Sequence, residues 1–306
     1  MKLFLLQGAR TSGKSALADK LSNIIGEDAT IIRSNSRSTI KERVNKMSLG
    51  NPDGVIILDT NKNSRKFRRS LYQFLKPMSV DVSVVMVYKP LSYLEKRAGS
   101  EQEKELIRNS YINLEVPRVN VDCDNVLVYG SETIFDKSSK VDNFELESVE
   151  DLLNVATDDI KKNLGSITTE EHDCPKYHLE SIADHIKIAM NHPLSKSVPS
   201  MKTVALFHDL GKIETKELNE DGMATYKKHA NISANYLLAW LADDFSPVDV
   251  QSMSMVEVVH QHMNVLDSGG LGSKNIRRND LGRLRLTIEL FNKIDKSSAI
   301  RGDLYE

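Results

Sequence analysis

Histidine and aspartate residues recur at intervals through the second half of this 306-residue chain. An adjacent pair, His208-Asp209, follows an apolar stretch and is itself followed closely by Lys212. Imidazole nitrogen and carboxylate oxygen together suit a divalent transition metal or Mg²⁺. A lone pair of this kind is usually a surface dipeptide, but here further residues of ligand type accompany it. These are His178, His185, His229, His262 and Asp295.

The N-terminus carries a second constellation, residues 8–15 (GARTSGKS), which matches the pattern G-x-x-x-x-G-K-[ST]. Backbone N–H groups of such a loop surround phosphate oxygens, and the following helix adds a partial positive charge. Lys14 is expected to reach the β- and γ-phosphates of ATP, and Ser15 to hold Mg²⁺. A chance glycine turn is the alternative. The residues expected to bind the nucleotide are Gly8, Ser12, Gly13, Lys14 and Ser15.

A carboxylate, Asp59, ends the apolar run 54–58. At the C-terminal end of a parallel strand such a group points into the ligand crevice. Asp59 is expected to orient a hydroxyl, to accept its proton or to support Mg²⁺. A turn residue or helix cap is the alternative, and it would be preferred if the phosphate loop were absent.

Two kinds of scaffold are predicted to position these residues. Before about residue 135, short apolar runs alternate with helical stretches, which indicates an α/β domain with a parallel sheet and helices on both faces. The predicted strands are 3–7, 54–58, 80–88 and 126–129, with a helix over 16–25. Later, helical periodicity dominates, and the predicted helices are 148–164, 178–191, 200–211, 229–241, 247–263 and 280–300. The polar segment 136–143 is interpreted as a linker, so the predicted domains are 1–145, which is α/β, and 146–306, which is all-α.

Composition limits the partners and the location. The formal net charge is −2, so nucleic acid would have to be held by local basic patches. Each of the two basic runs, taken alone, is better interpreted as a solvated face. They are Arg65, Lys66, Arg68 and Arg69, and Arg277, Arg278, Arg283 and Arg285. Two cysteines without a CxxC motif fit a reducing compartment, and no apolar stretch approaches membrane-spanning length. A soluble, cytoplasmic protein without a membrane partner is expected.

Over roughly residues 1–130 the chain resembles the polynucleotide 5′-kinase family. The resemblance is carried by the phosphate loop, by residues 59–63 (DTNKN), and by a strand over 84–88 followed by residues 94–97. It implies transfer of the ATP γ-phosphate to a 5′-hydroxyl of RNA or DNA, with Mg²⁺. It also implies that phosphates are contacted by Arg37, Arg97 and Arg108.

Two departures from that family bear on the kinase. The family's catalytic Asp precedes an Arg by three residues, whereas here Ser34 stands three residues before Arg37. Serine is a poor general base. The lid segment 99–103 is also short and acidic. The kinase is therefore weak, dependent on Asp59, or lost, although phosphoryl transfer relies mainly on positioning and electrostatics.

Roughly residues 170–300 resemble the HD-domain phosphohydrolase superfamily. In that superfamily separate helices supply first a His, then an adjacent His-Asp pair and last an Asp, which is the order of the residues here. The resemblance implies that His229 and His262 hold a second metal and that His178 contacts phosphate or that metal. The ions are expected to be Mn²⁺, Ni²⁺, Co²⁺ or Mg²⁺, which lower the pKa of bound water and polarise phosphoryl oxygens. The ligands that the resemblance implies for the first metal are His185, His208, Asp209 and Asp295.

The remaining candidates of this half carry an alternative each. Lys212 is expected to neutralise substrate phosphate beside the catalytic Asp209, unless it is a surface lysine. His260 is interpreted as an ordinary helix residue, and His172 and His192 as solvent-exposed.

The two resemblances together imply a bifunctional polynucleotide kinase/phosphatase that heals nucleic-acid ends. A break with a 5′-hydroxyl and a 3′-phosphate or 2′,3′-cyclic phosphate needs both activities before a ligase acts downstream, and RNA ends are slightly preferred. A second hypothesis is a phosphohydrolase of mononucleotides or signalling nucleotides whose phosphate loop senses a nucleotide. A third hypothesis makes the N-terminal half a degenerate RNA-binding module.

Overall fold

The computed structural model describes residues 1–137, 146–175, 178–263 and 284–300, and they form two compact units. Unit 1 consists of Met1–Thr133 and Leu241–Val250, and unit 2 of Ile134–Trp240 and the chain from Gln251 onward. The sequence placed the boundary near residue 145, where the composition changes. The structure divides the chain after Thr133 instead, because Phe135 already packs against aromatic rings of unit 2. Most of the expected linker, residues 138–143, lies outside the described residues.

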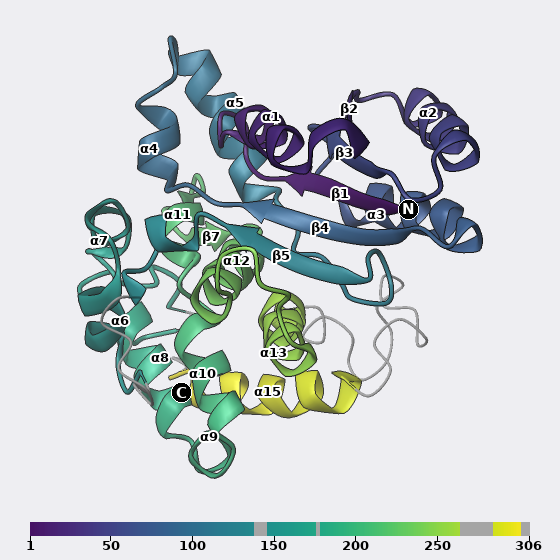
Figure 1. Cartoon of the computed structure of the whole chain (residues 1–306). Helices are drawn as coiled ribbons and strands as arrows, with labels where there is room; N and C mark the ends of the chain where they lie inside the picture. Colours follow the sequence, from purple (N-terminus) through teal and green to yellow (C-terminus); the bar gives the residue numbers. More distant parts are fainter. Residues whose placement is uncertain (138–145, 176–177, 264–283, 301–306) are drawn as a thin grey trace. The chain divides into compact units, whose positions relative to one another are not determined.

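Unit 1 is built on a five-stranded sheet with the order β2-β3-β1-β4-β5, and every pairing in it is parallel (Figure 1). The four strands predicted from apolar runs are confirmed. The fifth, β2, gave no such run because its side chains are largely half-buried or exposed. The strands are β1 (Lys2–Gln7), β2 (Ala29–Arg33), β3 (Val55–Asp59), β4 (Asp81–Val87) and β5 (Asn125–Tyr129).

Helices flank both faces of this sheet. Successive side chains of a strand point to opposite faces, and the adjacent Leu5 and Leu6 are both buried. Leu6 packs with Leu17 of α1, whereas Gln7, on the face of Leu5, accepts a hydrogen bond from Arg68 of α3. The helices of unit 1 are α1 (Lys14–Ile25), α2 (Arg37–Gly50), α3 (Arg65–Leu75), α4 (Leu91–Glu95) and α5 (Glu101–Ile112).

Serine side chains fix where three of these helices begin. Ser36, Ser64 and Ser100 precede α2, α3 and α5, and each hydroxyl accepts a hydrogen bond from the backbone N–H three residues on. Such caps satisfy one of the free N–H groups of the first turn. The start of α2, directly after β2, is thereby fixed at the same edge of the sheet as the phosphate loop.

The segment Leu241–Val250 completes unit 1 along β5. The backbone N–H groups of Phe245 and Val248 donate to the carbonyl oxygens of Val128 and Val126, at 2.8 and 2.9 Å. The carboxylate of Asp244 accepts from the backbone N–H of Gly130 and of Ser131. A chain segment more than 100 residues later therefore pairs with the outer edge of the sheet.

Unit 2 is mainly helical but contains a hairpin that the all-α prediction missed. Its strands, β6 (Lys216–Leu218) and β7 (Ala224–Tyr226), pair antiparallel. Strands of three residues are too short to show an alternating pattern, and the turn uses Gly222 with a φ of 76°. The helices are α6 (Val149–Val155), α7 (Asp158–Leu164), α8 (Ile182–Asn191), α9 (Pro193–Ser197), α10 (Pro199–Phe207), α11 (Lys212–Thr215), α12 (His229–Leu241), α13 (Val250–Gln261) and α15 (Leu284–Ser298).

The core of unit 2 joins these helices through aromatic rings. Phe135 meets Phe207, Tyr236 and Trp240 edge-on, with ring centroids 5.6 to 6.4 Å apart. The predicted helix 148–164 is divided in two, α6 and α7, and the predicted helix 178–191 begins only at Ile182. Throughout the described ranges, each helix is too short or too polar to cross a bilayer.

Candidate phosphate loop and metal centre

The phosphate loop lies between the end of β1 and the start of α1, as its motif requires. Gly13 has a φ of 93°, a conformation that glycine adopts without steric cost. A Cβ atom at Gly8 would lie 2.5 Å from the carbonyl oxygen of Val87. Both glycines of the motif are therefore needed for the course of the loop backbone.

Lys14 and Ser15 occupy the first turn of α1. The Lys14 ammonium donates to the carbonyl oxygens of Gly8 and Ala9, at 2.9 and 2.8 Å. Burial lowers the pKa of Lys14 to about 8, against the opposing charge of Asp59. The Ser15 hydroxyl donates to Asp59 Oδ2 at 2.6 Å. A hydroxyl beside a carboxylate suits Mg²⁺, so this geometry favours metal support among the three roles expected of Asp59.

The turn 59–63 is tied to the phosphate loop by amide side chains. Asn63 Nδ2 donates to the carbonyl oxygen of Gly8 at 2.9 Å, and Gln7 Nε2 donates to that of Lys62 at 2.8 Å. Asn35 Oδ1 accepts from the backbone N–H of Asn61 at 2.8 Å. The sequence did not single out Asn35 or Gln7, whose roles depend on contacts across the sheet.

Arg68 is buried beneath this turn, contrary to the expected solvated face. Its Nε donates to Asp122 Oδ2 at 2.8 Å, and both side chains have no exposed surface. Its Nη1 donates to Gln7 Oε1 and to the carbonyl oxygen of Asn63. The signal was present, because Phe67, Leu71 and Tyr72 place residue 68 on the apolar face of α3. In the second basic run, Arg277, Arg278 and Arg283 lie outside the described residues, and Arg285 pairs with Glu289.

The expected phosphate-binding arginines are exposed. Arg37 is the first residue of α2, Arg97 lies against Tyr93, and Arg108 pairs with Glu95 at 2.8 Å. Within the described ranges, no hydrogen bond joins any of these arginines to residues 8–15. Ser34 lies where the family's Asp is expected, and its backbone N–H donates to the carbonyl oxygen of Asp59 at 3.3 Å.

Four of the ligand-type residues converge in unit 2 from α8, the end of α10 and α15. His185 Nε2 lies 2.9 Å from Asp295 Oδ1 and 3.6 Å from Asp209 Oδ2. His208 Nε2 lies 3.1 Å from Asp209 Oδ2 and 3.4 Å from Asp295 Oδ1. The ligand atoms of all four residues fall within 4.8 Å of one another, so that they could hold one ion.

A second set shares Asp209. His229 Nε2 and His262 Nε2 lie 3.3 and 3.8 Å from Asp209 Oδ1, whereas the first set surrounds Oδ2. The structure thus brings together all six residues that the sequence proposed as ligands in this half, around one carboxylate.

Backbone carbonyl oxygens orient three of the four imidazole rings. The Nδ1 atoms of His208, His229 and His262 lie 2.6 to 2.8 Å from the carbonyl oxygen three residues earlier in the chain. A carbonyl oxygen only accepts, so each Nδ1 carries a proton, and the Nε2 of a neutral ring presents a lone pair. In His185 the Nδ1 atom instead faces Glu180 Oε1, at 3.1 Å.

This arrangement fits divalent ions. His229 Nε2 and His262 Nε2 face each other at 3.2 Å, and a metal ion or a proton between them would relieve the repulsion of two lone pairs at that distance. His208 Nε2 is buried and forms no directed hydrogen bond with any described residue. Ligating histidines commonly donate the other ring N–H to a carbonyl or carboxylate, which is the pattern here.

Charges within the centre shift the pKa values of its residues in opposite directions. Burial alone would lower the pKa of His208, but the negative charges of Asp209 and Asp295 raise it to about 10. Burial, then the neighbouring His229 and His208, lowers the pKa of His262 to about 3. Burial alone would raise the pKa of Asp209, yet nearby positive charge holds it well below its usual range. Without metal, the His208 ring is therefore charged, with a proton on each nitrogen, and the His262 ring is neutral.

A third polar group adjoins the first set, and it contains His172, which was expected to be exposed. That expectation is wrong: 1% of His172 is exposed, and its ring stacks on His178 with centroids 4.0 Å apart. His178 precedes α8 although the predicted helix included it, and its ring centroid lies 4.9 Å from that of His185. Lys212 is buried, with its ammonium 2.8 Å from Asp209 Oδ2, so the surface alternative for Lys212 is also wrong.

Gly211 allows the end of α10 and the start of α12 to approach. A Cβ atom there would lie 2.3 Å from the carbonyl oxygen of His229. The glycine after the His-Asp pair therefore has a packing role, because any side chain would push His229 away from Asp209.

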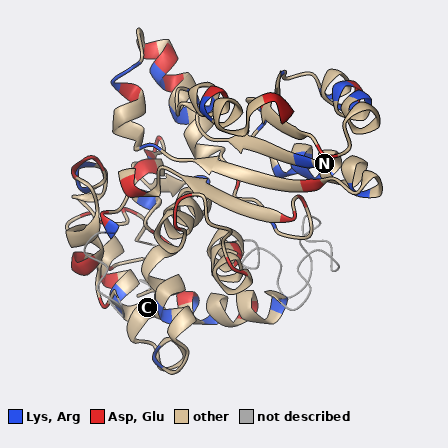
Figure 2. Ribbon diagram, viewed as in Figure 1, with Lys and Arg blue, Asp and Glu red and all other residues tan. Residues whose placement is uncertain are grey.

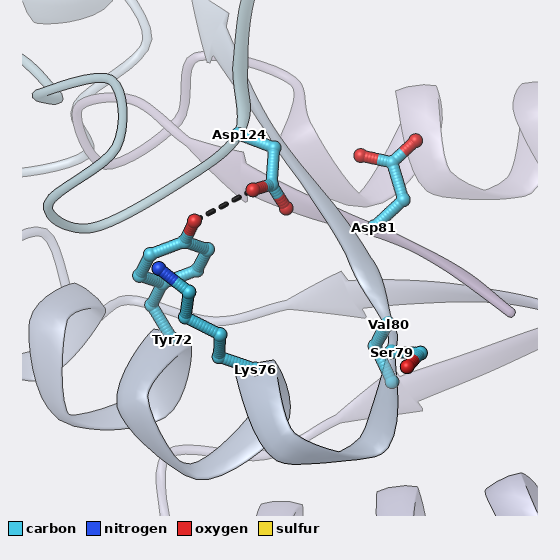
Figure 3. Close-up of a pocket in the computed structure, with 6 residues that line it drawn as sticks. All are labelled: Tyr72, Lys76, Ser79, Val80, Asp81 and Asp124. Carbon is cyan, nitrogen blue, oxygen red and sulfur yellow. Dashed lines mark hydrogen bonds between the residues drawn. The ribbon is translucent and has the colours of Figure 1, made fainter.

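A separate cavity of about 320 Å³ lies in unit 1 at the amino ends of β4 and β5 (Figure 3). There the Tyr72 hydroxyl donates to Asp124 Oδ1 at 2.6 Å, and Asp124 Oδ2 accepts from the backbone N–H of Val82. The phosphate loop lies at the opposite, carboxyl ends of the strands. No residue that the sequence proposed as functional lines this cavity.

No family model matches the chain, and no curated protein matches it. Similar solved structures include a gluconokinase from Sinorhizobium meliloti 1021 (18% identity, TM-score 0.29) and Kti12 from Chaetomium thermophilum in complex with ADP-AlF3 (18%, 0.32). A third is YorR from Bacillus subtilis in complex with phosphorylated GDP (21%, 0.27). Each alignment covers 42% of this chain. It covers 83% of the gluconokinase, 88% of Kti12 and 84% of YorR. At these TM-scores the similarities carry no argument, and the fold of unit 1 follows from its own strand order and loop.

Proposed function

We propose that the chain is a nucleic-acid end-healing enzyme. Unit 2 removes a 3′-phosphate, or opens a 2′,3′-cyclic phosphate, with two divalent ions, and unit 1 phosphorylates 5′-hydroxyl ends from ATP. The observation that carries the proposal is Asp209, whose two carboxylate oxygens face different sets of histidines. Together with the resemblance to HD-domain phosphohydrolases, this arrangement supports a binuclear phosphohydrolase.

Each residue of unit 2 has a defined task in this proposal. The first ion is held by His185, His208, Asp209 and Asp295, and the second by Asp209, His229 and His262. The ions lower the pKa of bound water and polarise the phosphoryl oxygens. Lys212, held against Asp209, neutralises a substrate phosphate oxygen.

Phosphate release tests the phosphohydrolase. Oligonucleotides ending in a 3′-phosphate or a 2′,3′-cyclic phosphate are incubated with protein and Mn²⁺, Ni²⁺, Co²⁺ or Mg²⁺ in turn. Release is expected with at least one ion and is lost in His208→Gln. His260→Gln, which changes a histidine of α13 outside both ligand sets, is the matched control. Full activity of His208→Gln would disprove the metal assignment.

The kinase proposal rests on the phosphate loop and the pairing of Ser15 with Asp59. Lys14 binds the ATP phosphates, Arg37 and Arg97 bind phosphates of the nucleic acid, and Mg²⁺ lies near Ser15. Lysine and arginine gather on α2, which begins at Arg37 (Figure 2), and this local positive charge supports a nucleic-acid partner despite the net charge of −2. Labelled ATP should mark a 5′-hydroxyl oligonucleotide, and an RNA oligonucleotide should be labelled more strongly than a DNA oligonucleotide.

One observation favours a second function, a phosphohydrolase of mononucleotides with a nucleotide-sensing or RNA-binding unit 1. Ser34 provides no carboxylate, and Asp59 is already engaged with Ser15, so unit 1 lacks an evident general base. ATP binding without any labelled oligonucleotide, together with faster hydrolysis of mononucleotides than of oligonucleotides, would establish this alternative.

A further inference from the structure

We propose that Lys212, in the third polar group formed with His172, His178 and Glu180, binds a phosphate oxygen of the substrate and that His172 is the positioning residue that holds Lys212 for it. The inference rests on the phosphohydrolase function proposed for the adjacent metal centre. His172, His178 and Glu180 are also of residue types that bind metals, and their ligand atoms lie within 4.8 Å of one another. The contacts of each residue decide between the two occupants.

Glu180 has no lone pair left for a metal. Its Oε1 accepts from Nδ1 of His178 at 2.7 Å and of His185 at 3.1 Å. Its Oε2 accepts from the backbone N–H groups of Leu179 and Ile300, at 3.1 and 3.0 Å. A carboxylate offers about four acceptor positions, and these four donors fill them. Glu180 therefore orients the two histidines and does not serve as a ligand.

His172 directs its second ring nitrogen, Nε2, at the ammonium of Lys212. Its Nδ1 donates to the carbonyl oxygen of Glu180 at 2.8 Å, so Nε2 carries the lone pair, and that lone pair accepts from Lys212 Nζ at 3.1 Å. A divalent ion bound to Nε2 would have to displace the ammonium and would then repel it. The group therefore disfavours a third metal.

Lys212 is left with one N–H to offer. An ammonium has three donors, and the described contacts use two, to Asp209 Oδ2 at 2.8 Å and to His172 Nε2 at 3.1 Å. An oxyanion that accepts the third lies directly beside the carboxylate shared by both ligand sets. The ammonium also lies over the Tyr226 ring, 5.4 Å from its centroid. Without His172 it would keep Asp209 as its single hydrogen-bond partner, and the direction of its remaining N–H groups would be less well fixed.

Binding of inorganic phosphate to the full-length, metal-loaded protein tests the inference by calorimetry. Lys212→Met should weaken phosphate binding by about tenfold or more, as expected for a lost charge-assisted hydrogen bond. His172→Phe keeps a ring but removes the acceptor and should approach that loss. His172→Gln retains an acceptor and should stay near the wild type. The double variant His172→Phe/Lys212→Met should lose no more than Lys212→Met alone, because His172 acts through Lys212.

Metal content provides the opposing outcome. Two ions per chain are expected in the wild type and in all variants. Three ions in the wild type with two in His172→Phe would overturn the inference in favour of a third metal, as would unchanged phosphate affinity in Lys212→Met. That variant leaves the stacking of His172 in place and decides the matter even if His172→Phe does not fold. Failure of the proposed function has another signature, two bound ions and measurable phosphate affinity without hydrolysis of any substrate.

Discussion

The phosphate loop of unit 1 and the metal centre of unit 2 differ in how the chain assembles a site. The loop uses consecutive residues and mainly backbone groups, so its geometry follows from Gly8 and Gly13. The metal centre uses six side chains distributed between His185 and Asp295, and each must be aimed separately. A contiguous motif thus specifies its own shape, whereas a dispersed site needs an orienting contact for each member.

In the metal centre, most of the orienting contacts come from residues nearby in the sequence. His208, His229 and His262 each use a carbonyl oxygen three residues earlier, and for His208 and His262 this carbonyl belongs to the last turn of a helix. Those carbonyl groups lack a partner within the helix, so one contact satisfies the helix end and directs the ring. His185 is the exception, since its direction depends on Glu180. For His208, His229 and His262 the tertiary fold therefore only has to bring the ends of helices together, whereas His185 and Asp295 lie within α8 and α15.

Of the changes considered, loss of the shared carboxylate should have the largest effect, and it should act on the metal centre alone. Asp209→Asn removes a charged ligand from both sets, so we expect loss of both ions and of phosphate release. Metal content after dialysis and phosphate release measure the two effects. Asp221→Asn, in the exposed hairpin turn, is the control, and ATP binding by unit 1 should be unaffected. Retention of both ions would mean that Asp209 does not bridge them.

The reciprocal change is Lys14→Met. It removes the charge proposed to bind the ATP phosphates, so we expect ATP binding and any labelling of 5′-hydroxyl ends to be abolished, while any phosphate release by unit 2 continues. Lys20→Met, on the exposed side of the same helix, serves as the matched variant. Equal ATP affinity in the two variants would argue against a nucleotide site at the loop.

A smaller effect is expected from Glu180→Gln. The amide cannot accept from both imidazoles in the same way, so His185 loses its orienting partner, and metal affinity should fall by roughly 10- to 100-fold. Titration with a competing chelator measures the affinity. Glu171→Gln, an exposed carboxylate nearby, should leave it unchanged. If Glu180→Gln also leaves the metal affinity unchanged, the His185 ring is oriented by packing alone.

The smallest expected effect concerns pH. His208 has a pKa of about 10 in the metal-free protein, so it is protonated at neutral pH and must lose its proton to bind an ion. Metal affinity should therefore rise with pH, by about tenfold per unit for one released proton, until the pH approaches that pKa. Calorimetry in two buffers of different ionisation enthalpy counts the protons. An affinity that is independent of pH between 6 and 8 would show that metal binding displaces no proton from His208 in that range.

Sequence reasoning reached the residues whose spacing repeats a pattern and missed those whose role depends on distant contacts. The parallel sheet and most helices followed from apolar periodicity, and the ligand series from residue type and order. His172 and Glu180 lie in a polar stretch without periodicity, and Arg68 gains its role from Asp122, 54 residues later. The hairpin of unit 2 was missed because its strands have three residues each.

The pairing of residues 241–250 with β5 determines when unit 1 can be completed. During synthesis the carbonyl oxygens of Val126 and Val128 have no partner until Phe245 and Val248 have left the ribosome, by which time most of unit 2 has been made. A fragment that stops at residue 145 would expose this strand edge, which favours association with other chains. Separate production of unit 1 therefore requires the later segment to be joined to it, and the two units cannot be separated by a single cut.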